Sequence, residues 1–417
     1  MITAKNIEIM SPVGSYESLM AAIQGGADAV YFGIENLNMR ANSSKNFTIN
    51  DLQKISAICQ KHNIRTYITL NTIIFDDELK LMKQIVDAAK ENNISALIAS
   101  DVSVMKYAKS KGVEIHISTQ CNITNFEAVK FYSQFADVIV TARELELKQV
   151  KAIIDSIKKE EIKGPSGKLI QIEIFAHGAL CMAVSGKCYL SLDNENSSAN
   201  RGACLQICRR PYKVTDKDGG IELEIDNEYI MSPKDLCTIG FLDKILSTGV
   251  RVLKIEGRGR SPEYVKTVTE CYREATNSYF DKTYSAEKIK EWMKKLNSVY
   301  NRGFWEGYYL GEKMGEWTKK YGSQATKKKL YVGKITNYFT NLKVAEVKIE
   351  TNNLSIYDEV IILGPTTGVY EATISEIRVN LKNVKKTIKG EICSIPLEEL
   401  VRRNDKLYKL IDSELWE

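Results

Sequence analysis

Cysteines carry the clearest chemical signal in this sequence. The chain has nine of them, and four lie close together in its middle, at Cys181, Cys188, Cys204 and Cys208. Gathered thiolates bind zinc or an iron–sulfur cluster, and burial as apolar side chains is the third possibility. Structural zinc sites favour closely spaced pairs, which only Cys204 and Cys208 approach, whereas a 4Fe-4S cluster accepts wider spacing from separate loops. The spacing therefore favours a cluster over zinc.

A fifth cysteine, Cys237, follows a local helix-start signal. Ser232 can cap a helix, Pro233 suits the first helical position, and Asp235 completes a Ser-x-x-Asp pattern. We therefore expect Cys237 near the N-terminus of a helix, where the helix dipole favours a thiolate.

The cysteine region is also basic. Between Ser197 and Thr215 there is no acidic residue, and the basic ones are Arg201, Arg209, Arg210 and Lys213. This charge suits an anionic cluster, the phosphates of a nucleic acid or the carboxylates of a small substrate, and a solvated surface loop is the plain alternative.

The elements that position these residues alternate between short β-branched or aromatic runs and longer amphipathic stretches. This alternation predicts repeated βα units, and eight of them form a (β/α)8 TIM-like barrel with its active site at the carboxyl ends of the strands. The eight expected strands are residues 7–10, 29–33, 65–70, 96–99, 114–118, 136–140, 170–175 and 252–255. Polar residues at or just past these strands become site candidates: Asn71, Asp101, Gln120, Arg143, His177 and Glu256.

A second region follows the barrel. The composition changes after a helical stretch at 285–296 and an aromatic segment containing Phe304, Trp305, Tyr308 and Tyr309, and a basic linker is expected at 319–329. Beyond it, short alternating runs separated by turn residues predict a small C-terminal all-β barrel of five or six strands. We therefore divide the chain into residues 1–325, the TIM-like barrel with the cysteine site, and 326–417.

Composition limits the class of protein. The chain has 417 residues, 44% hydrophobic and 27% charged, which is the balance of a globular protein. No apolar run approaches the ~20 residues that cross a bilayer, and the first residues lack an export signal, so we expect a cytoplasmic protein. A net charge of +5 is compatible with a nucleic-acid partner without requiring one.

Several segments resemble one known family. The stretch from Glu173 to Ser191, EIFAHGALCMAVSGKCYLS, fits the signature of the U32 peptidase family, and IEIMSPVGS, GADAVYFG, STQCNITN, NRGACLQICRRPY, MSPKDLC and LKIEGRGR are also similar to it. Members of this length resemble prephenate-dependent proteins that hydroxylate the wobble uridine of tRNA to 5-hydroxyuridine with a 4Fe-4S cluster. Related members act on a ribosomal cytidine or on ubiquinone precursors. The resemblance also implies a TIM-like barrel.

The resemblance assigns the cluster ligands, and the chemistry of the polar residues suggests the other roles. Cys181, Cys188 and Cys204 match the family's cluster ligands, and the fourth is of either the Cys208 or the Cys237 type. We favour Cys237 because a ligand from a separate loop closes a cage more easily. For catalysis and proton movement the candidates are Gln120, Arg143, Glu173 and His177. For binding tRNA or the two carboxylates of prephenate they are Asn71, Arg201, Lys254, Glu256 and Arg258.

Two other functions stay open. A peptidase is the one that the family's name asserts, but the sequence has no H-E-x-x-H helix and no G-x-S-x-G elbow. A cysteine protease would need a Cys–His pair. Of the three histidines, only His177 could activate Cys181 as the nucleophile. The third candidate is a noncatalytic partner in a hydroxylation complex, and the sequence assigns neither a homo- nor a hetero-oligomer.

Overall fold

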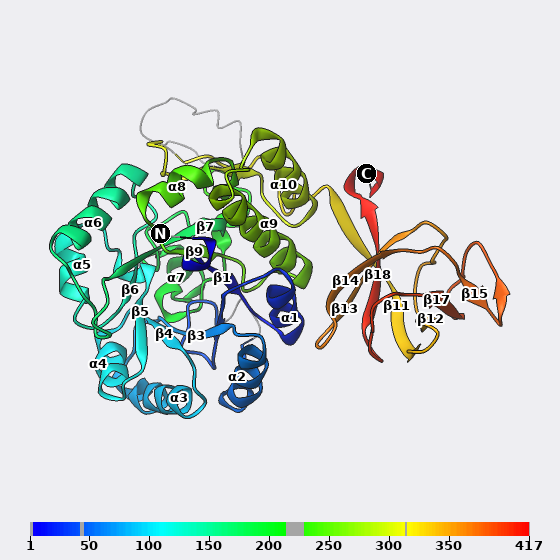
Figure 1. Cartoon of the computed structure of the whole chain (residues 1–417), viewed down its shortest axis with the longest axis horizontal. Helices are drawn as coiled ribbons and strands as arrows, with labels where there is room; N and C mark the ends of the chain where they lie inside the picture. Colours follow the sequence, from blue (N-terminus) through cyan, green and yellow to red (C-terminus); the bar gives the residue numbers. More distant parts are fainter. Residues whose placement is uncertain (1–2, 42–45, 214–228, 313–314, 417) are drawn as a thin grey trace.

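The computed structural model describes residues 3–41, 46–213, 229–312 and 315–416. It consists of a helix-covered barrel and a C-terminal β-sheet that lies beside it (Figure 1). None of the helices within these ranges is long and apolar enough to cross a membrane.

The barrel has eight parallel strands, as predicted. They pair in chain order, and the barrel closes because β9 pairs with both β7 and β1. A small cluster that includes Met10, Tyr31, Tyr67 and Ile98 lies apart from the main apolar core, on strands of the barrel. The strands are β1 (Glu8–Pro12), β2 (Ala29–Gly33), β3 (Arg65–Leu70), β4 (Ala96–Ala99), β5 (Glu114–Ile117), β6 (Val138–Val140), β7 (Gln171–Ala179) and β9 (Val252–Ile255).

Helices surround the barrel because each has one apolar stripe to bury. In α6, buried residues recur at Leu147, Val150, Ile154 and Ile157, the spacing of one helical face. Ser15, Asp101 and Asn125 cap helices by accepting hydrogen bonds from backbone N–H groups. The helices are α1 (Tyr16–Gln24), α2 (Leu52–Lys61), α3 (Leu79–Glu91), α4 (Val102–Ser110), α5 (Phe126–Tyr132), α6 (Leu147–Lys159), α8 (Leu242–Thr248), α9 (Pro262–Phe280) and α10 (Ala286–Ser298).

A long excursion between β7 and β9 carries the clustered cysteines. It contains α7 (Leu190–Glu195) and β8 (Asp235–Cys237), which pairs antiparallel with the end of β7 and parallel with β10 (Phe304–Trp305). The expected helix start at Cys237 was therefore wrong, because sheet pairing on both sides of β8 outweighs the local capping signal.

The C-terminal region is all-β and antiparallel, as predicted, but it has eight strands rather than five or six. The additional ones include two-residue strands, and among the described strands no pairing joins β14 to β16 to close the ladder. The expected linker is also shorter, because its last three lysines begin β11. The strands are β11 (Lys327–Phe339), β12 (Val344–Ile349), β13 (Glu359–Gly364), β14 (Gly368–Thr373), β15 (Arg378–Val379), β16 (Lys382–Asn383), β17 (Ile392–Pro396) and β18 (Lys406–Asp412).

The C-terminal sheet has its own core and also packs on the barrel, where β13 and β14 face α1 and α9 (Figure 1). Gln24 of α1 donates to the carbonyl of Thr367 at 3.0 Å and accepts from the amide of Val369 at 2.9 Å. Ile361, Leu363 and Val369 belong to the same apolar cluster as the barrel core. The two parts therefore share one continuous interior.

Gly178 allows the end of β7 to pass close to the chain after β9. Its φ is +104°, and a Cβ there would lie 2.2 Å from the carbonyl oxygen of Glu256. We expect Gly178→Ala to lower the free energy of unfolding by about 3 kcal/mol through strain and this clash. Gly167→Ala is the control, since its φ is +77° but nothing lies within 4 Å; it should cost only about 1 kcal/mol in urea denaturation. Equal losses in the two variants would contradict the steric argument.

Candidate functional site

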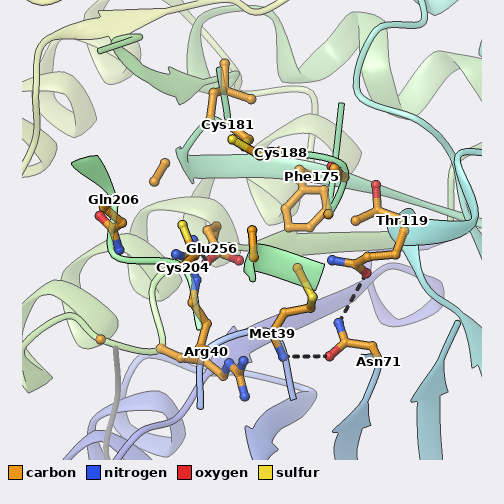
Figure 2. A pocket seen from close by; sticks show the side chains of 18 of the residues that line it. Met39, Arg40, Asn71, Thr119, Phe175, Cys181, Cys188, Cys204, Gln206 and Glu256 are labelled. Atoms are coloured by element: carbon orange, nitrogen blue, oxygen red, sulfur yellow. Dashed lines mark hydrogen bonds and ion pairs between the residues drawn. The ribbon is translucent and has the colours of Figure 1, made fainter. Parts of the chain in front are cut away.

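A cavity of about 230 Å³ lies at the carboxyl ends of the barrel strands. Asn71 follows β3, Gln120 follows β5, Arg143 follows β6, and Glu256 follows β9. The structure thus brings together polar residues that the strand pattern selected from distant parts of the chain, and Figure 2 shows Asn71 and Glu256 at this cavity. Asp101 does not join them, because its carboxylate caps α4.

Four cysteines line the same cavity: Cys181, Cys188, Cys204 and Cys208. Burial raises the pKa of Cys208, the nearby sulfurs of the other three add to this effect, and Arg209 opposes it. Four thiols that repel one another as thiolates suit a cationic metal centre, which would relieve that repulsion. As placed, the described residues contain no group of three or more Cys, His, Asp or Glu side chains already arranged around a metal ion. The four cysteines therefore suit a metal centre in their chemistry and share one cavity, but their side chains do not converge on a single point.

Cys237 does not reach this cavity. It is 7% exposed, burial raises its pKa to about 12, and its thiol donates to the sulfur of Met293 on α10 at 3.8 Å. Its place in β8 directs the side chain toward the covering helices. The structure therefore favours Cys208 over Cys237 as the fourth member of the cysteine group.

Cations dominate the rest of the cavity wall. Glu256 is the one carboxylate among the described lining residues, and Arg40 holds it in an ion pair at 3.0 Å. Arg258 donates to the Thr69 hydroxyl at 2.8 Å, and Arg143 stacks on the Phe175 ring at 3.8 Å. The cationic lining residues are Arg40, Arg143, Arg209, Lys254, Arg258 and Arg260. Such a wall favours an anionic ligand.

Arg40 is a lining residue that the sequence analysis missed. It lies well beyond the end of β2, so reading just past each strand could not find it. Its loop is fixed to the site because the Met39 amide donates to Asn71, whose side-chain amide in turn donates to Gln120 at 3.2 Å (Figure 2).

The acid form of Glu256 is strongly disfavoured. Burial alone would raise its pKa, but Arg40, Arg143 and Arg258 lower it to about 2. A carboxyl group whose pKa is lower in the folded state stabilises the protein above the unfolded pKa of ~4.5, and this stability is lost as pH falls through the folded value. For Glu256 the contribution is about 3 kcal/mol. We therefore expect urea denaturation between pH 5 and pH 2 to show a steeper loss of stability in the wild type than in Glu256→Gln. Parallel curves would contradict this assignment.

Glu173 lies below the cavity rather than on its wall. This fully buried carboxylate binds Lys254 at 2.8 Å and His116 Nδ1 at 3.4 Å, and the other ring nitrogen of His116 lies 3.3 Å from Glu114. Burial opposes both charges, yet Lys254 and His116 keep the pKa of Glu173 low, and Glu114 and Glu173 raise that of His116. Glu173 therefore acts on the cavity through Lys254, which does line it.

Two other candidates lie away from the cavity. His177 is 1% exposed among Tyr264, Tyr272 and Phe304, and burial lowers its pKa to about 3, so it is neutral and isolated from substrate. Arg201 binds Glu78 through both of its terminal nitrogens. These positions do not support the direct roles expected for them.

The aromatic segment is also structural. Trp305 and Tyr309 are buried in the main core, and Phe304 and Tyr308 pack against it. Core packing therefore accounts for this segment.

The fold and cavity define a (β/α)8-barrel protein with cysteines and arginines at the carboxyl end of its strands. The chain belongs to peptidase family U32, whose sequence pattern matches residues 14–319. It is 58% identical to a Porphyromonas gingivalis protein named "Collagenase", across 98% of this chain and 99% of that protein. It is 31% identical to "tRNA hydroxylation protein P1" of Bacillus subtilis, across 90% of this chain and 88% of that protein. It is 34% identical to "tRNA hydroxylation protein P" of Helicobacter pylori, across 72% and 71%.

Proposed function

We propose that this protein is an iron–sulfur RNA hydroxylase that converts the wobble uridine of tRNA to 5-hydroxyuridine with prephenate as cosubstrate. The observation that carries the proposal is that four cysteines and a cationic wall share one cavity at the barrel mouth. The names of the B. subtilis and H. pylori relatives support RNA as the substrate class.

The 4Fe-4S cluster would be held by Cys181, Cys188, Cys204 and Cys208. Such a cluster supplies redox or Lewis-acid chemistry when bound. We call residues 181–208, which carry the four cysteines, the cysteine loop. Arg209 supports this loop, because it donates to the carbonyls of Leu180 at 2.6 Å and Pro233 at 2.7 Å.

Prephenate would bind through its two carboxylates. Arg143 and Arg258 offer planar guanidinium groups to them, and Lys254 adds a point charge that Glu173 keeps in place. A cavity of about 230 Å³ suits a ligand of this size or a single base. The uridine would enter splayed from the anticodon loop, because its ring carbon cannot be reached in a stack. The amides of Asn71 and Gln120 can then orient the base.

Peptidase activity is the competing function, and the name of the P. gingivalis relative favours it. A cysteine protease needs a histidine beside its nucleophile, and this cavity has none on its wall. His62 lies on the surface at the end of α2, and His116 and His177 are buried away from the cavity wall. No cysteine of the cavity therefore has a histidine beside it to act as a general base.

Gene deletion followed by mass spectrometry of tRNA nucleosides tests the proposal. We expect 5-hydroxyuridine derivatives to disappear and to return with the wild-type gene or Lys163→Gln, but not with Cys204→Ser. Unchanged nucleosides in the deletion strain would overturn the proposal. A noncatalytic partner would be indicated if the purified protein, supplied with cluster and prephenate, supports hydroxylation of tRNA only when a second protein is added. Cleavage of gelatin by the wild type, lost in Cys204→Ser, would indicate the peptidase.

A further inference from the structure

A second depression adjoins the cavity along the cysteine loop. Cys204, Gln206 and Arg209 line both, so the two are continuous along this loop. A second link is Arg260, a cavity residue that stacks at 3.6 Å on the ring of Tyr300, which lines the depression. A ligand lying in this groove would therefore lie next to the cavity.

The groove is strongly basic. Four cations line it, Arg209, Arg210, Arg302 and Lys320, and none of its described lining residues is a carboxylate. Two of these cations are structural, because Arg302 pairs with Asp235 at 3.3 Å and Arg209 is fixed by backbone carbonyls. The other two face solvent: Lys320 is exposed, and Arg210 is 60% exposed and forms only a long ion pair with Glu195 at 3.8 Å.

An exposed aromatic ring lies beside these cations. Tyr321 is 71% exposed, and its ring lies 6.3 Å from that of Tyr229. A tyrosine this exposed buries little apolar surface in the folded protein, so core packing does not explain it. Cations for phosphates next to a ring for a base are the combination that binds single-stranded nucleic acid.

We propose that this groove binds the single-stranded part of an RNA next to the nucleotide that enters the cavity. Arg210 and Lys320 contact its phosphates, and a base stacks on Tyr321. The inference rests on the proposed function and assigns to it the path by which the RNA approaches. It also unites the basic cysteine loop with the start of the linker, two segments far apart in the sequence.

Fluorescence anisotropy with a labelled anticodon stem-loop RNA tests the groove in the full-length protein. We expect Tyr321→Ala to weaken binding about tenfold, the loss of one stacked base. The double variant Arg210→Gln with Lys320→Gln should reduce the slope of log Kd against log salt by about 1.4, since each phosphate contact with a single strand contributes about 0.7. A fully paired RNA duplex of the same length should bind more weakly and should be insensitive to Tyr321→Ala.

Matched controls lie away from the groove. Lys163→Gln with Lys168→Gln makes the same change of charge at exposed sites before β7, and Tyr357→Ala removes a tyrosine that is 81% exposed in the C-terminal region. Equal effects of the groove and control variants would overturn the groove, as would equal competition by a polyglutamate peptide. If the wild type restores 5-hydroxyuridine in cells while the groove variants bind RNA normally, only the groove fails. If the wild type binds no RNA and restores no nucleoside, the proposed function fails with it.

Discussion

Replacing Cys208 with serine is expected to remove most of the iron from protein reconstituted anaerobically, with retention weakened at least about tenfold. Cys208 shares the cavity with three other cysteines, and burial raises its pKa, with a further contribution from their sulfurs. A serine hydroxyl there would leave one position of the cluster without a thiolate. Iron and sulfide analysis, with the visible absorption spectrum, measures the effect.

Two controls make this result specific. Cys237→Ser should keep its iron, because this thiol is buried against Met293. Cys59→Ser, in a fully buried position on α2, reports any general effect of removing a thiol from the core. Retained iron in Cys208→Ser together with loss in Cys237→Ser would reverse the assignment, and a wild type that binds no iron would remove the cluster from the proposal.

Glu173→Gln is expected to lower the free energy of unfolding by about 4 kcal/mol, because it leaves the buried charges of Lys254 and His116 without their partner. The folded pKa of His116 is raised, so its share of this stability is complete below about pH 6.5 and is lost as pH rises through the folded value. Urea denaturation should therefore show a larger difference between wild type and variant at pH 5.5 than at pH 9.

The double variant Glu173→Gln with Lys254→Met separates the ion pair from general packing. Removing both charges should recover a large part of the loss, since a buried pair replaced as a whole costs little. Glu160→Gln is the surface control, because this carboxylate is 46% exposed in its ion pair with Lys130, and it should cost under about 1 kcal/mol. A loss below about 1 kcal/mol in Glu173→Gln would contradict the buried ion pair.

The sequence predicted the barrel well because each strand is short, apolar and followed by an amphipathic helix. Seven of its eight strands begin within one residue of the expected position, and β6 begins two residues late. The same pattern found Asn71, Gln120, Arg143 and Glu256, since parallel strands end at one mouth. Lys254 and Arg258, which we expected to bind the carboxylates of the substrate, also line the cavity.

Long-range pairing decided what the sequence could not predict. Local signals at Ser232 and Pro233 indicated a helix, but β7 and β10 hold this segment as β8 and turn Cys237 away from the cavity. His177 was expected just past the seventh strand, but β7 continues to Ala179 where it pairs with β8, so His177 lies within the strand and packs in the aromatic core. Arg40 reaches the site from a long loop, and no spacing rule gives the path of such a loop.

The clamp that Gln24 forms on Thr367 and Val369 has a practical consequence. The apolar side chains of Ile361, Leu363 and Val369 complete the interior beside α1 and α9. A chain cut near residue 326 would lose these side chains and expose the apolar surface of α1 and α9 to water. Such an exposed apolar patch promotes aggregation. Anyone wishing to crystallise or re-engineer the barrel should therefore keep its C-terminal companion attached.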